Sequence, residues 1–123
     1  MNKKPFIYIA SPYTLGDPGI NSHYSCKVFD DLMNVGRIWP VAPLWSHLQH
    51  LICPRPYKDW LEYDRAMIPL LDGCLRIDID MPKLNYFQSE SAGADEEVAL
   101  FKELGKPVFH DTNDMYRWVD SLQ

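Results

Sequence analysis

Two acidic residues, Asp64 and Glu97, occupy positions where the surrounding pattern predicts an apolar helix face. The stripe around Asp64 consists of Trp60, Met67, Ile68 and Leu71, and the stripe beside Glu97 consists of Ala94, Val98, Phe101 and Leu104. A carboxylate that faces a core costs free energy unless it is paired or protonated. It is therefore retained mainly where it has a strong partner or a chemical function, such as proton transfer or nucleophilic attack.

An alternative explanation is available for each acid taken alone. The predicted face can be rotated by one position, or the carboxylate can pair with an arginine such as Arg65 or Arg76. Both acids, however, fall on helices of one chain. Glu97 also falls in the first turns of its helix, where the helix dipole favours an ionised carboxylate. Asp64 and Glu97 are therefore treated as a candidate pair.

Other polar residues near these acids have more ordinary explanations. Ser91, Ala92 and Gly93 open the helix that carries Glu97, and small residues there let a ligand approach free backbone N–H groups. Serine is also a common helix N-cap. Tyr8, in the first apolar run, is a third candidate, although a core aromatic residue with a satisfied hydroxyl is the simpler explanation.

The histidines do not predict a metal site. His47 and His50 are three residues apart on a possible short helix, a spacing that can hold a metal ion. No carboxylate completes the cluster locally, so no metal centre is expected.

The elements that must position these residues alternate along the chain. Strands are predicted over 5–10, 37–43, 74–79 and 107–110, and residues 80–90 are predicted to be a loop. Helices are predicted from about 22 to 35, over 44–52, over 59–71 and over 91–104, and from 113 to the end. Asp59 and Asn113 are the expected N-caps of two of these helices, and Gly36, Gly73 and Gly105 are the expected stops.

This alternation predicts an α/β fold with three layers, in which helices flank a mostly parallel sheet, as in flavodoxin-like or Rossmann-like proteins. In such folds ligands bind at the carboxyl ends of the strands. Those ends fall at residues 11–14, 43–47 and 78–80, and in the segment before Ser91.

Length and composition limit the classes of function. The chain has 123 residues, which predicts one domain over 1–123, and its 46% hydrophobic and 24% charged residues are typical of a globular protein. Twelve basic residues face 17 acidic ones, for a net charge of −5, and no basic run occurs. A nucleic acid polymer is therefore not an expected partner.

The cysteines and the start of the chain indicate a cellular compartment. Three cysteines without a Cys-x-x-Cys spacing argue against a disulfide framework and a zinc site. No segment fits a signal peptide or a membrane span. We therefore expect a cytoplasmic protein that does not associate with a membrane.

Several motifs occur together in a combination known from one superfamily. They are Ile7-Tyr8-Ile9-Ala10-Ser11-Pro12-Tyr13, Asp64 with Asp72 eight residues later, Ser91-x-Gly93-x-x-x-Glu97 with Ala99, and Gly105-Lys106-Pro107-Val108. Over nearly its whole length the chain resembles the nucleoside 2-deoxyribosyltransferase superfamily, in a small branch found in phages and bacteria. That superfamily includes the 2′-deoxynucleoside 5′-monophosphate N-hydrolases. The resemblance implies one domain of that fold, no metal or organic cofactor, and a homo-oligomer.

The resemblance also implies roles for the candidate residues. Glu97 would attack C1′ of a deoxyribose and displace the base, which gives a glycosyl-enzyme ester that water or a second base resolves. Asp64 would be the acid and base at the departing nucleobase, and Tyr8 would hold Glu97 by a hydrogen bond. The residues expected to bind substrate are Ser11, Tyr13, Trp45, His47, Ser91, Ala92 and Gly93.

The identity of residue 91 bears on the substrate. The transferases of this superfamily usually have an aspartate there, which binds a free 5′-hydroxyl, whereas the monophosphate hydrolases have a serine that helps to bind phosphate. Ser91 therefore favours cleavage of the N-glycosidic bond of a nucleoside 5′-monophosphate. Two departures stand against this: residues 11–14 contain no arginine, and residues 80–90 are longer than expected in either enzyme type.

Three alternatives remain beside this expectation. The chain can be a transferase that exchanges bases on free deoxynucleosides, or a module that binds nucleotides without turnover. It can also be a structural α/β domain whose acids are ion-paired.

Overall fold

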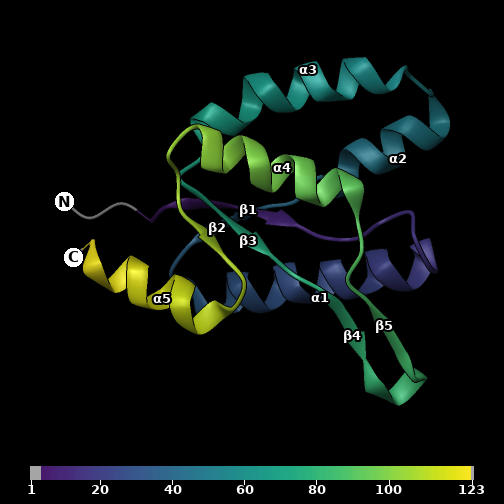
Figure 1. The fold of residues 1–123 in the computed structure, drawn as a ribbon. Helices are drawn as coiled ribbons and strands as arrows, with labels where there is room; N and C mark the ends of the chain where they lie inside the picture. The colour runs from purple at the N-terminus through teal and green to yellow at the C-terminus, as the bar shows by residue number, and fades with distance from the viewer. Residues whose placement is uncertain (1–3, 123) are drawn as a thin grey trace.

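Four parallel strands form the central sheet of the molecule (Figure 1). The structure is a computed structural model that describes residues 4–122. The strands are β1 (Phe6–Ala10), β2 (Trp39–Val41), β3 (Gly73–Arg76) and β6 (Val108–Phe109), in the spatial order β2-β1-β3-β6. All three strand pairs are parallel. Since β1 lies between β2 and β3, the chain reverses its direction of winding there, which places a crevice at the carboxyl ends of these strands.

Helices cover both faces of the sheet. α1 (Pro18–Val35) and α5 (Thr112–Ser121) lie on one face, and α4 (Ala92–Glu103) lies on the other. α3 (Tyr57–Met67) runs along the outer side of α4, and α2 (Leu44–Ile52) lies at the end toward which the strands point (Figure 1). The predicted three-layer α/β architecture with a mostly parallel sheet is confirmed.

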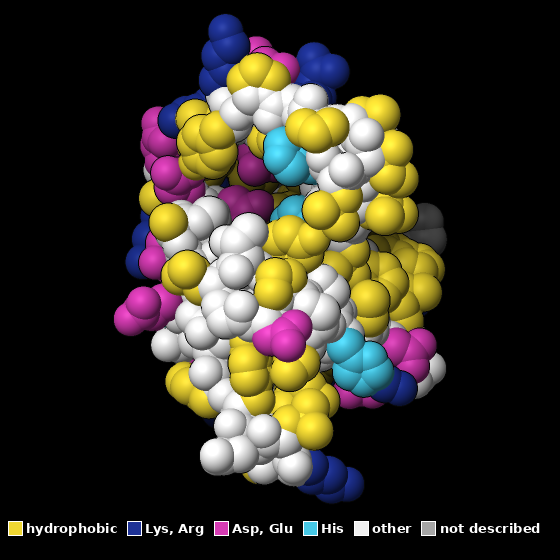
Figure 2. Space-filling view, turned by 90° about the vertical axis from the view of Figure 1, so that its right-hand side faces the viewer, with side chains coloured by type: hydrophobic (Ala, Val, Ile, Leu, Met, Phe, Trp, Pro, Cys, Tyr) yellow, Lys and Arg dark blue, Asp and Glu magenta, His cyan; other side chains and the backbone are white. Residues whose placement is uncertain are grey.

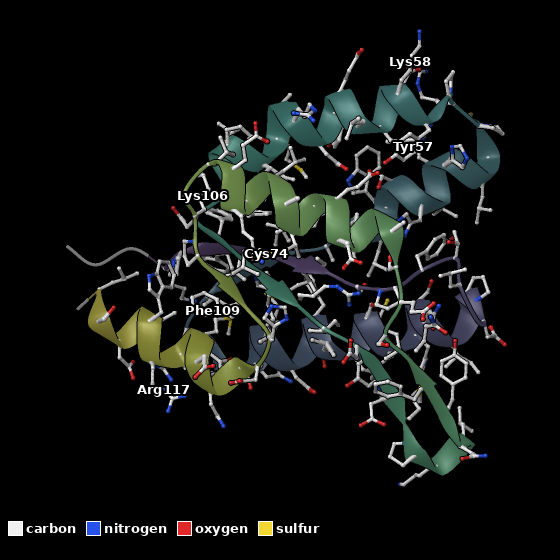
Figure 3. All side chains as sticks on the ribbon, in the orientation of Figure 1. Tyr57, Lys58, Cys74, Lys106, Phe109 and Arg117 are labelled. Atoms are coloured by element: carbon white, nitrogen blue, oxygen red, sulfur yellow. The ribbon has the colours of Figure 1, made fainter. Side chains whose placement is uncertain are left out.

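The alternation of side chains along β1 divides the core into two clusters. Tyr8 and Ala10 point toward α4, whereas Ile7 and Ile9 point toward α1 and α5, and all four are fully buried. Burial on both faces is typical of a central strand in a parallel sheet. Cys74 takes the corresponding position in the middle of the sheet beside Tyr8 (Figure 3). Tyr8 is thereby held with its ring under α4.

The segment over residues 80–90 is not a loop, so that prediction was wrong. β4 (Ile79–Met81) and β5 (Tyr86–Gln88) form an antiparallel hairpin, and a 3₁₀ turn, η2 (Pro82–Leu84), connects them. Asn85 supplies the left-handed backbone conformation at the turn, with φ of 51°. The turn lacks the Asn-Gly or Asp-Gly signal of a short hairpin, and strands of three residues are too short to show alternation.

Helix α1 starts earlier than its apolar period indicates. It begins at Pro18, and the Asp17 carboxylate accepts hydrogen bonds from the amides of Gly19 (2.9 Å) and Ile20 (3.1 Å). An aspartate N-cap followed by proline in the first turn explains the start, because proline has no N–H to satisfy there. Gly36 ends the helix with φ of 76°, as predicted.

Two predicted N-caps were wrong. Asp59 lies inside the first turn of α3, which starts directly after Pro56, and it accepts a hydrogen bond from Arg55 Nε at 3.1 Å. The cap of α5 is Asp111 rather than Asn113, and its carboxylate accepts from the Asp114 amide at 2.8 Å. The first residue of α3 is Tyr57, two positions before Asp59, and the first residue of α5 is Thr112, one position before Asn113.

Helix α3 also ends earlier than predicted. It stops at Met67 and continues as a 3₁₀ turn, η1 (Ile68–Leu70), while Gly73 already belongs to β3. Pro69 explains this end, because proline has no N–H to donate to the Arg65 carbonyl four residues earlier. Within residues 4–122, no helix combines the length and the apolar character that a membrane span requires.

Candidate active site

A pocket of about 380 Å³ opens at the carboxyl end of the sheet. Figure 2 shows this face hollowed, with acidic and histidine side chains inside and hydrophobic ones around them. The lining residues come from four segments. They are Ser11, Tyr13 and Thr14 after β1; Pro43, Ser46, His47, His50 and Leu51 around α2; Tyr57, Trp60, Leu61 and Asp64 of α3; and Ser91, Gly93, Ala94, Glu96, Glu97 and Leu100 of α4 and its N-cap.

Glu97 lines this pocket and contacts Tyr8, which is fully buried and does not itself line the pocket. Glu97 lies one turn after the buried Ala94 on α4, and the Tyr8 hydroxyl donates a hydrogen bond to its carboxylate. The pKa of Glu97 is raised to about 8, mainly by burial and also by the charge of Asp64, whereas the hydrogen bond from Tyr8 and the charge of Arg76 oppose the rise. Burial and Glu97 together raise the pKa of Tyr8 well above its ordinary value, so its phenol stays protonated and keeps donating.

Asp64 faces the same pocket from α3. Burial raises the pKa of its carboxyl to about 6. Among the ion pairs of residues 4–122, none involves Asp64 or Glu97, so neither Arg65 nor Arg76 neutralises these acids directly. Between pH 6 and 8 the two carboxyls therefore hold about one proton between them, and it resides more on Glu97 than on Asp64.

The wall that α2 contributes is aromatic and neutral. The ring of His47 stacks on Tyr13, with centroids 3.7 Å apart. Burial, and then the neighbouring His50, lower the pKa of His47 to about 4, so the ring is neutral near pH 7. Its Nδ1 atom is buried without a hydrogen-bond partner among the described residues.

His50 has a defined tautomer. Its Nδ1 accepts hydrogen bonds from the Trp60 indole N–H (2.9 Å) and from the Arg55 amide (3.2 Å). A ring nitrogen that accepts two donors carries no proton, which leaves the hydrogen on Nε2. The α2 wall thus offers an N–H donor on His50 and a second polar edge on His47.

The start of α4 forms the opposite rim. The Ser91 hydroxyl accepts a hydrogen bond from the Ala94 amide at 3.1 Å, which confirms serine as the N-cap. A side chain added at Gly93 would meet no atom within 4 Å, so this glycine leaves open space in front of the backbone. Ser11 faces the same cavity, and its hydroxyl lies 3.0 Å from that of Ser25. Hydroxyls and a helix N-terminus here suit a polar group on a ligand.

The pocket holds most of the sequence-predicted residues but not all of them. Ser11, Tyr13, His47, Ser91 and Gly93 line it beside Glu97 and Asp64. Ala92 and Trp45 do not: Ala92 is exposed, and Trp45 is exposed and contacts Tyr63 edge-on, with centroids 6.1 Å apart. Trp45 falls in the segment 43–47 after the second predicted strand, but its spacing of two residues from His47 puts it on another side of α2.

Asp72, the second acid of the family pattern, lies away from the pocket. Its carboxylate accepts a hydrogen bond from the Phe6 amide at 2.8 Å, at the start of β1. Because the pocket lies at the other end of β1, Asp72 does not belong to the site. It binds the first amide of that strand instead.

Several lining residues were not predicted from the sequence to bind substrate. His50, Leu51, Tyr57 and Leu61 close the outer side of the pocket, and Figure 3 shows Tyr57 at the end of the molecule where α2, α3 and α4 converge. Helix α2 contains no charged residue, and no side chain in it is fully buried. A neutral helix with an exposed apolar side was the available signal that this segment borders a cavity.

Comparisons with protein-family models, with curated proteins and with solved structures found no match to this chain. Within the described part of the chain, no group of three or more His, Cys, Asp or Glu side chains could hold a metal ion.

Proposed function

We propose that this protein cleaves the N-glycosidic bond of a 2′-deoxynucleoside, with Glu97 as the nucleophile. The observation that carries the proposal is the half-buried carboxyl of Glu97 in the pocket, which is hydrogen-bonded to Tyr8 and has no ion pair among the described residues. The second carboxyl that this chemistry requires is Asp64, which faces the same cavity. The resemblance to the nucleoside 2-deoxyribosyltransferase superfamily supports the same assignment.

In the first step the Glu97 carboxylate attacks C1′ of the sugar. A C1′–O bond forms, the C1′–N bond breaks, and the departing base takes the bonding electron pair. Asp64 gives its proton to a nitrogen of that base, which leaves as a neutral molecule. The developing positive charge on the sugar ring is stabilised by the negative charge of the attacking carboxylate.

In the second step water hydrolyses the glycosyl ester. The water oxygen attacks C1′, its proton passes to the Asp64 carboxylate, and Glu97 leaves as a carboxylate, so both acids return to their starting state. Because C1′ is inverted twice, the sugar product retains its configuration. If a second base takes the place of water, the same chemistry is base exchange.

Tyr8 has a defined part in both steps. Its hydroxyl fixes one carboxylate oxygen of Glu97 and stabilises the anion, which leaves the other oxygen to attack. In the free protein the shared proton resides mainly on Glu97. The reactive form, with the proton on Asp64, is thus a minor one of the same total charge. A bound base that displaces water from Asp64 raises the pKa of that carboxyl and increases the reactive fraction.

The α2 wall is the expected binding surface for the base. The stacked rings of His47 and Tyr13 offer a flat apolar surface, and His50 Nε2 offers a hydrogen-bond donor. A neutral wall fits an uncharged heteroaromatic ring better than it fits a charged group. This supports a nucleobase as the part of the ligand that lies near Asp64.

The charge of the pocket distinguishes a free nucleoside from a nucleoside 5′-monophosphate as the substrate. The lining contains the three carboxyls of Asp64, Glu96 and Glu97, and no lysine or arginine occurs among the lining residues that the structure describes. A phosphate dianion would be repelled, while the hydroxyls of Ser11 and Ser91 satisfy an uncharged 5′-hydroxyl. The free nucleoside is therefore the favoured substrate.

A nucleoside 5′-monophosphate is the second candidate. Ser91 at the N-terminus of α4 favours it, since the helix dipole and free N–H groups there attract an anion. The two candidates share the chemistry at C1′ and differ only in the group bound at the rim of the pocket.

Turnover and trapping test the proposal. The protein is incubated with the four 2′-deoxynucleosides and with their 5′-monophosphates, and free base is measured by chromatography. A 2′-fluorinated analogue, which slows hydrolysis of the ester, should leave a sugar attached to the peptide that contains Glu97, as detected by mass spectrometry. Release of base without a trapped sugar on Glu97 would contradict the assignment of Glu97 as the nucleophile. A thermal shift with nucleosides but no base release would indicate a binding module.

A further inference from the structure

The β4–β5 hairpin (79–88) projects from the body of the molecule beside α1 and connects β3 to α4 (Figure 1). None of residues 79–88 lines the pocket. The side chain of Tyr86 and the carbonyl just after β5 are nevertheless hydrogen-bonded to residues that fix the pocket-lining segments. The proposed catalytic chemistry leaves this connection unexplained.

The first connection runs through Tyr86 to the loop between β1 and α1. The Tyr86 hydroxyl donates to Asn21 Oδ1 at 2.8 Å and accepts from the Asp17 amide at 2.8 Å. Asn21 is fully buried, and its Nδ2 donates to the carbonyls of Tyr13 (2.9 Å) and Leu15 (2.8 Å). Tyr86 and Asn21 together thus fix the loop that presents Tyr13 to the pocket.

The shape of that loop matches the tyrosine. Gly16 has φ of 80°, which an L side chain rarely adopts. A Cβ atom added at Gly16 would overlap the Tyr86 hydroxyl. Both the backbone conformation and the close approach of the hairpin therefore require glycine at this position.

The second connection runs through Arg76 to the start of α4. Arg76 is only 8% exposed, and its guanidinium donates to the carbonyls of Ile77 (2.6 Å) and Ser89 (2.5 Å). It also lies 3.5 Å from Asp95 in the first turn of α4. Since Ser91 follows Ser89 by two residues, Arg76 joins the end of β3, the exit of the hairpin and the rim of the pocket.

We propose that the β4–β5 hairpin is a positioning element. Tyr86 of β5, and Arg76 of β3 through its hydrogen bond to the exit of the hairpin, hold the two rims of the pocket in the arrangement that binds the ligand. Removing one member of a buried polar network leaves its partners unsatisfied, which loosens the segments they hold. Tyr86 and Arg76 touch no ligand themselves and act through Asn21 and Ser89. The kinetic part of the test below rests on the proposed function, whereas the exchange measurement does not.

The first experiment compares Tyr86→Phe with Tyr116→Phe by amide hydrogen exchange on the full chain. The Tyr116 hydroxyl is buried without a hydrogen-bond partner among the described residues, so its loss is a matched control for removal of a phenol oxygen. Amides of residues 13–17 should exchange about tenfold faster in Tyr86→Phe and at the wild-type rate in Tyr116→Phe. Unchanged exchange in Tyr86→Phe would overturn the role of the hairpin.

The same two variants are then assayed with 2′-deoxyadenosine and thymidine. Tyr86→Phe should raise KM several-fold while kcat changes by less than about twofold, because Glu97 and Asp64 lie on other elements. Tyr116→Phe should change neither constant. A loss confined to kcat would overturn the positioning role, since it would mean that the hairpin acts on the chemistry rather than on binding.

Arg76 is tested by a charge-preserving and a charge-removing variant. Both Arg76→Lys and Arg76→Met lose the two-pronged contact with the carbonyls, so both should raise KM and speed exchange over residues 89–93. Besides the hydrogen bond from the neutral Tyr8, the charged groups that act on the pKa of Glu97 are Asp64, Arg76 and Glu96. Only Arg76→Met should move the alkaline limb of kcat/KM upward, because only it removes the charge. Identical pH profiles in the two variants and wild type would overturn the electrostatic part of the role.

The outcomes separate this inference from the proposed function. Faster exchange over 13–17 in Tyr86→Phe supports the hairpin as a positioning element even if wild type releases no base from any nucleoside, in which case only the proposed function fails. Base release by wild type together with unchanged exchange and unchanged KM in Tyr86→Phe and in the two Arg76 variants would refute the positioning role alone.

Discussion

The two faces of the sheet hold carboxylates in different surroundings. Beside α5, Asp120 pairs with Arg37 and Asp114 pairs with Arg117, all four at the surface. The hydrogen bond from Arg117 lowers the pKa of Asp114. On the opposite face, the pocket acids Glu97 and Asp64 have raised pKa values and no ion pair among the described residues.

The surface carboxylates are stabilised by water alone, whereas the ionised pocket carboxyls are not, so their presence requires another explanation. A surface carboxylate near an arginine loses little on folding and gains little from the pair. A buried carboxyl without a cation destabilises the folded state in its ionised form, so its presence calls for a compensating role. The comparison predicts opposite effects when an acid on each face is made neutral.

The largest effect is expected for Glu97→Gln, with Asp120→Asn as the control on the other face. Glutamine keeps an acceptor for Tyr8 but cannot attack C1′, so base release should fall by about a thousandfold or more. Asp120→Asn should leave activity unchanged and alter the free energy of unfolding by less than about 1 kcal/mol. More than a tenth of wild-type turnover in Glu97→Gln would remove it as the nucleophile, and Glu96 would be tested next.

A smaller loss is expected for Asp64→Asn. The variant cannot protonate the departing base, which should lower turnover by roughly a hundredfold to ten-thousandfold. Its melting temperature should not fall, because a partly desolvated charge is removed from a site without an ion pair. A drop of many degrees would show that Asp64 belongs to a structural network instead. Substrates whose bases leave without a proton should be affected least.

The pH dependence of stability extends the comparison to the folding equilibrium. The pKa of Glu97 is about 8 in the folded protein against 4.5 for an ordinary glutamate, so the folded state binds the proton more tightly. The resulting stabilisation is complete below pH 4.5 and is lost as the pH rises toward 8. Chemical denaturation from pH 5 to 8 should therefore show a fall in unfolding free energy that Glu97→Gln lacks. Parallel curves for the two proteins would contradict the burial of an ionisable Glu97.

The sequence predicts the layers and the principal acids because these depend on local pattern. The short apolar strands, the glycine at position 36 and the acids on two apolar stripes are each visible within about a dozen residues. The hairpin at 79–88 was missed, because its stability comes from contacts of Tyr86 with Asn21, 65 residues away in the chain. The same limit applies to His50, whose tautomer depends on Trp60 from the next helix.

Variants of Ser91, at the pocket rim, test which 5′ group of the ligand the start of α4 binds. Ser91→Ala removes a hydroxyl and a helix cap, and the loss of one neutral hydrogen bond should lower kcat/KM for a deoxynucleoside by about two- to tenfold. Ser91→Asp keeps the cap and offers a stronger acceptor to a 5′-hydroxyl, so it should keep the nucleoside as a substrate and exclude the monophosphate. A Ser91→Ala loss confined to the monophosphate would favour the phosphate-binding alternative.

The smallest expected effect concerns Glu96, which lines the pocket beside the catalytic pair without belonging to it. If the three lining carboxyls disfavour a phosphate, removal of one charge should reduce the difference in kcat/KM between the nucleoside and its 5′-monophosphate. Glu96→Gln should therefore raise kcat/KM for a 5′-monophosphate by about two- to fivefold and leave the nucleoside unchanged, since a partly solvated charge is worth on the order of 1 kcal/mol at such a distance. Glu103→Gln is the matched control, because Glu103 lies exposed at the last residue of α4 and does not line the pocket. The gain from Glu96→Gln should also shrink as salt is added, whereas a steric effect of the side chain would not depend on salt. The ratio of kcat/KM for the monophosphate to kcat/KM for the nucleoside could instead be the same in wild type and both variants. That result would mean that lining charge does not select the substrate, and that the 5′ end of the ligand lies outside the pocket.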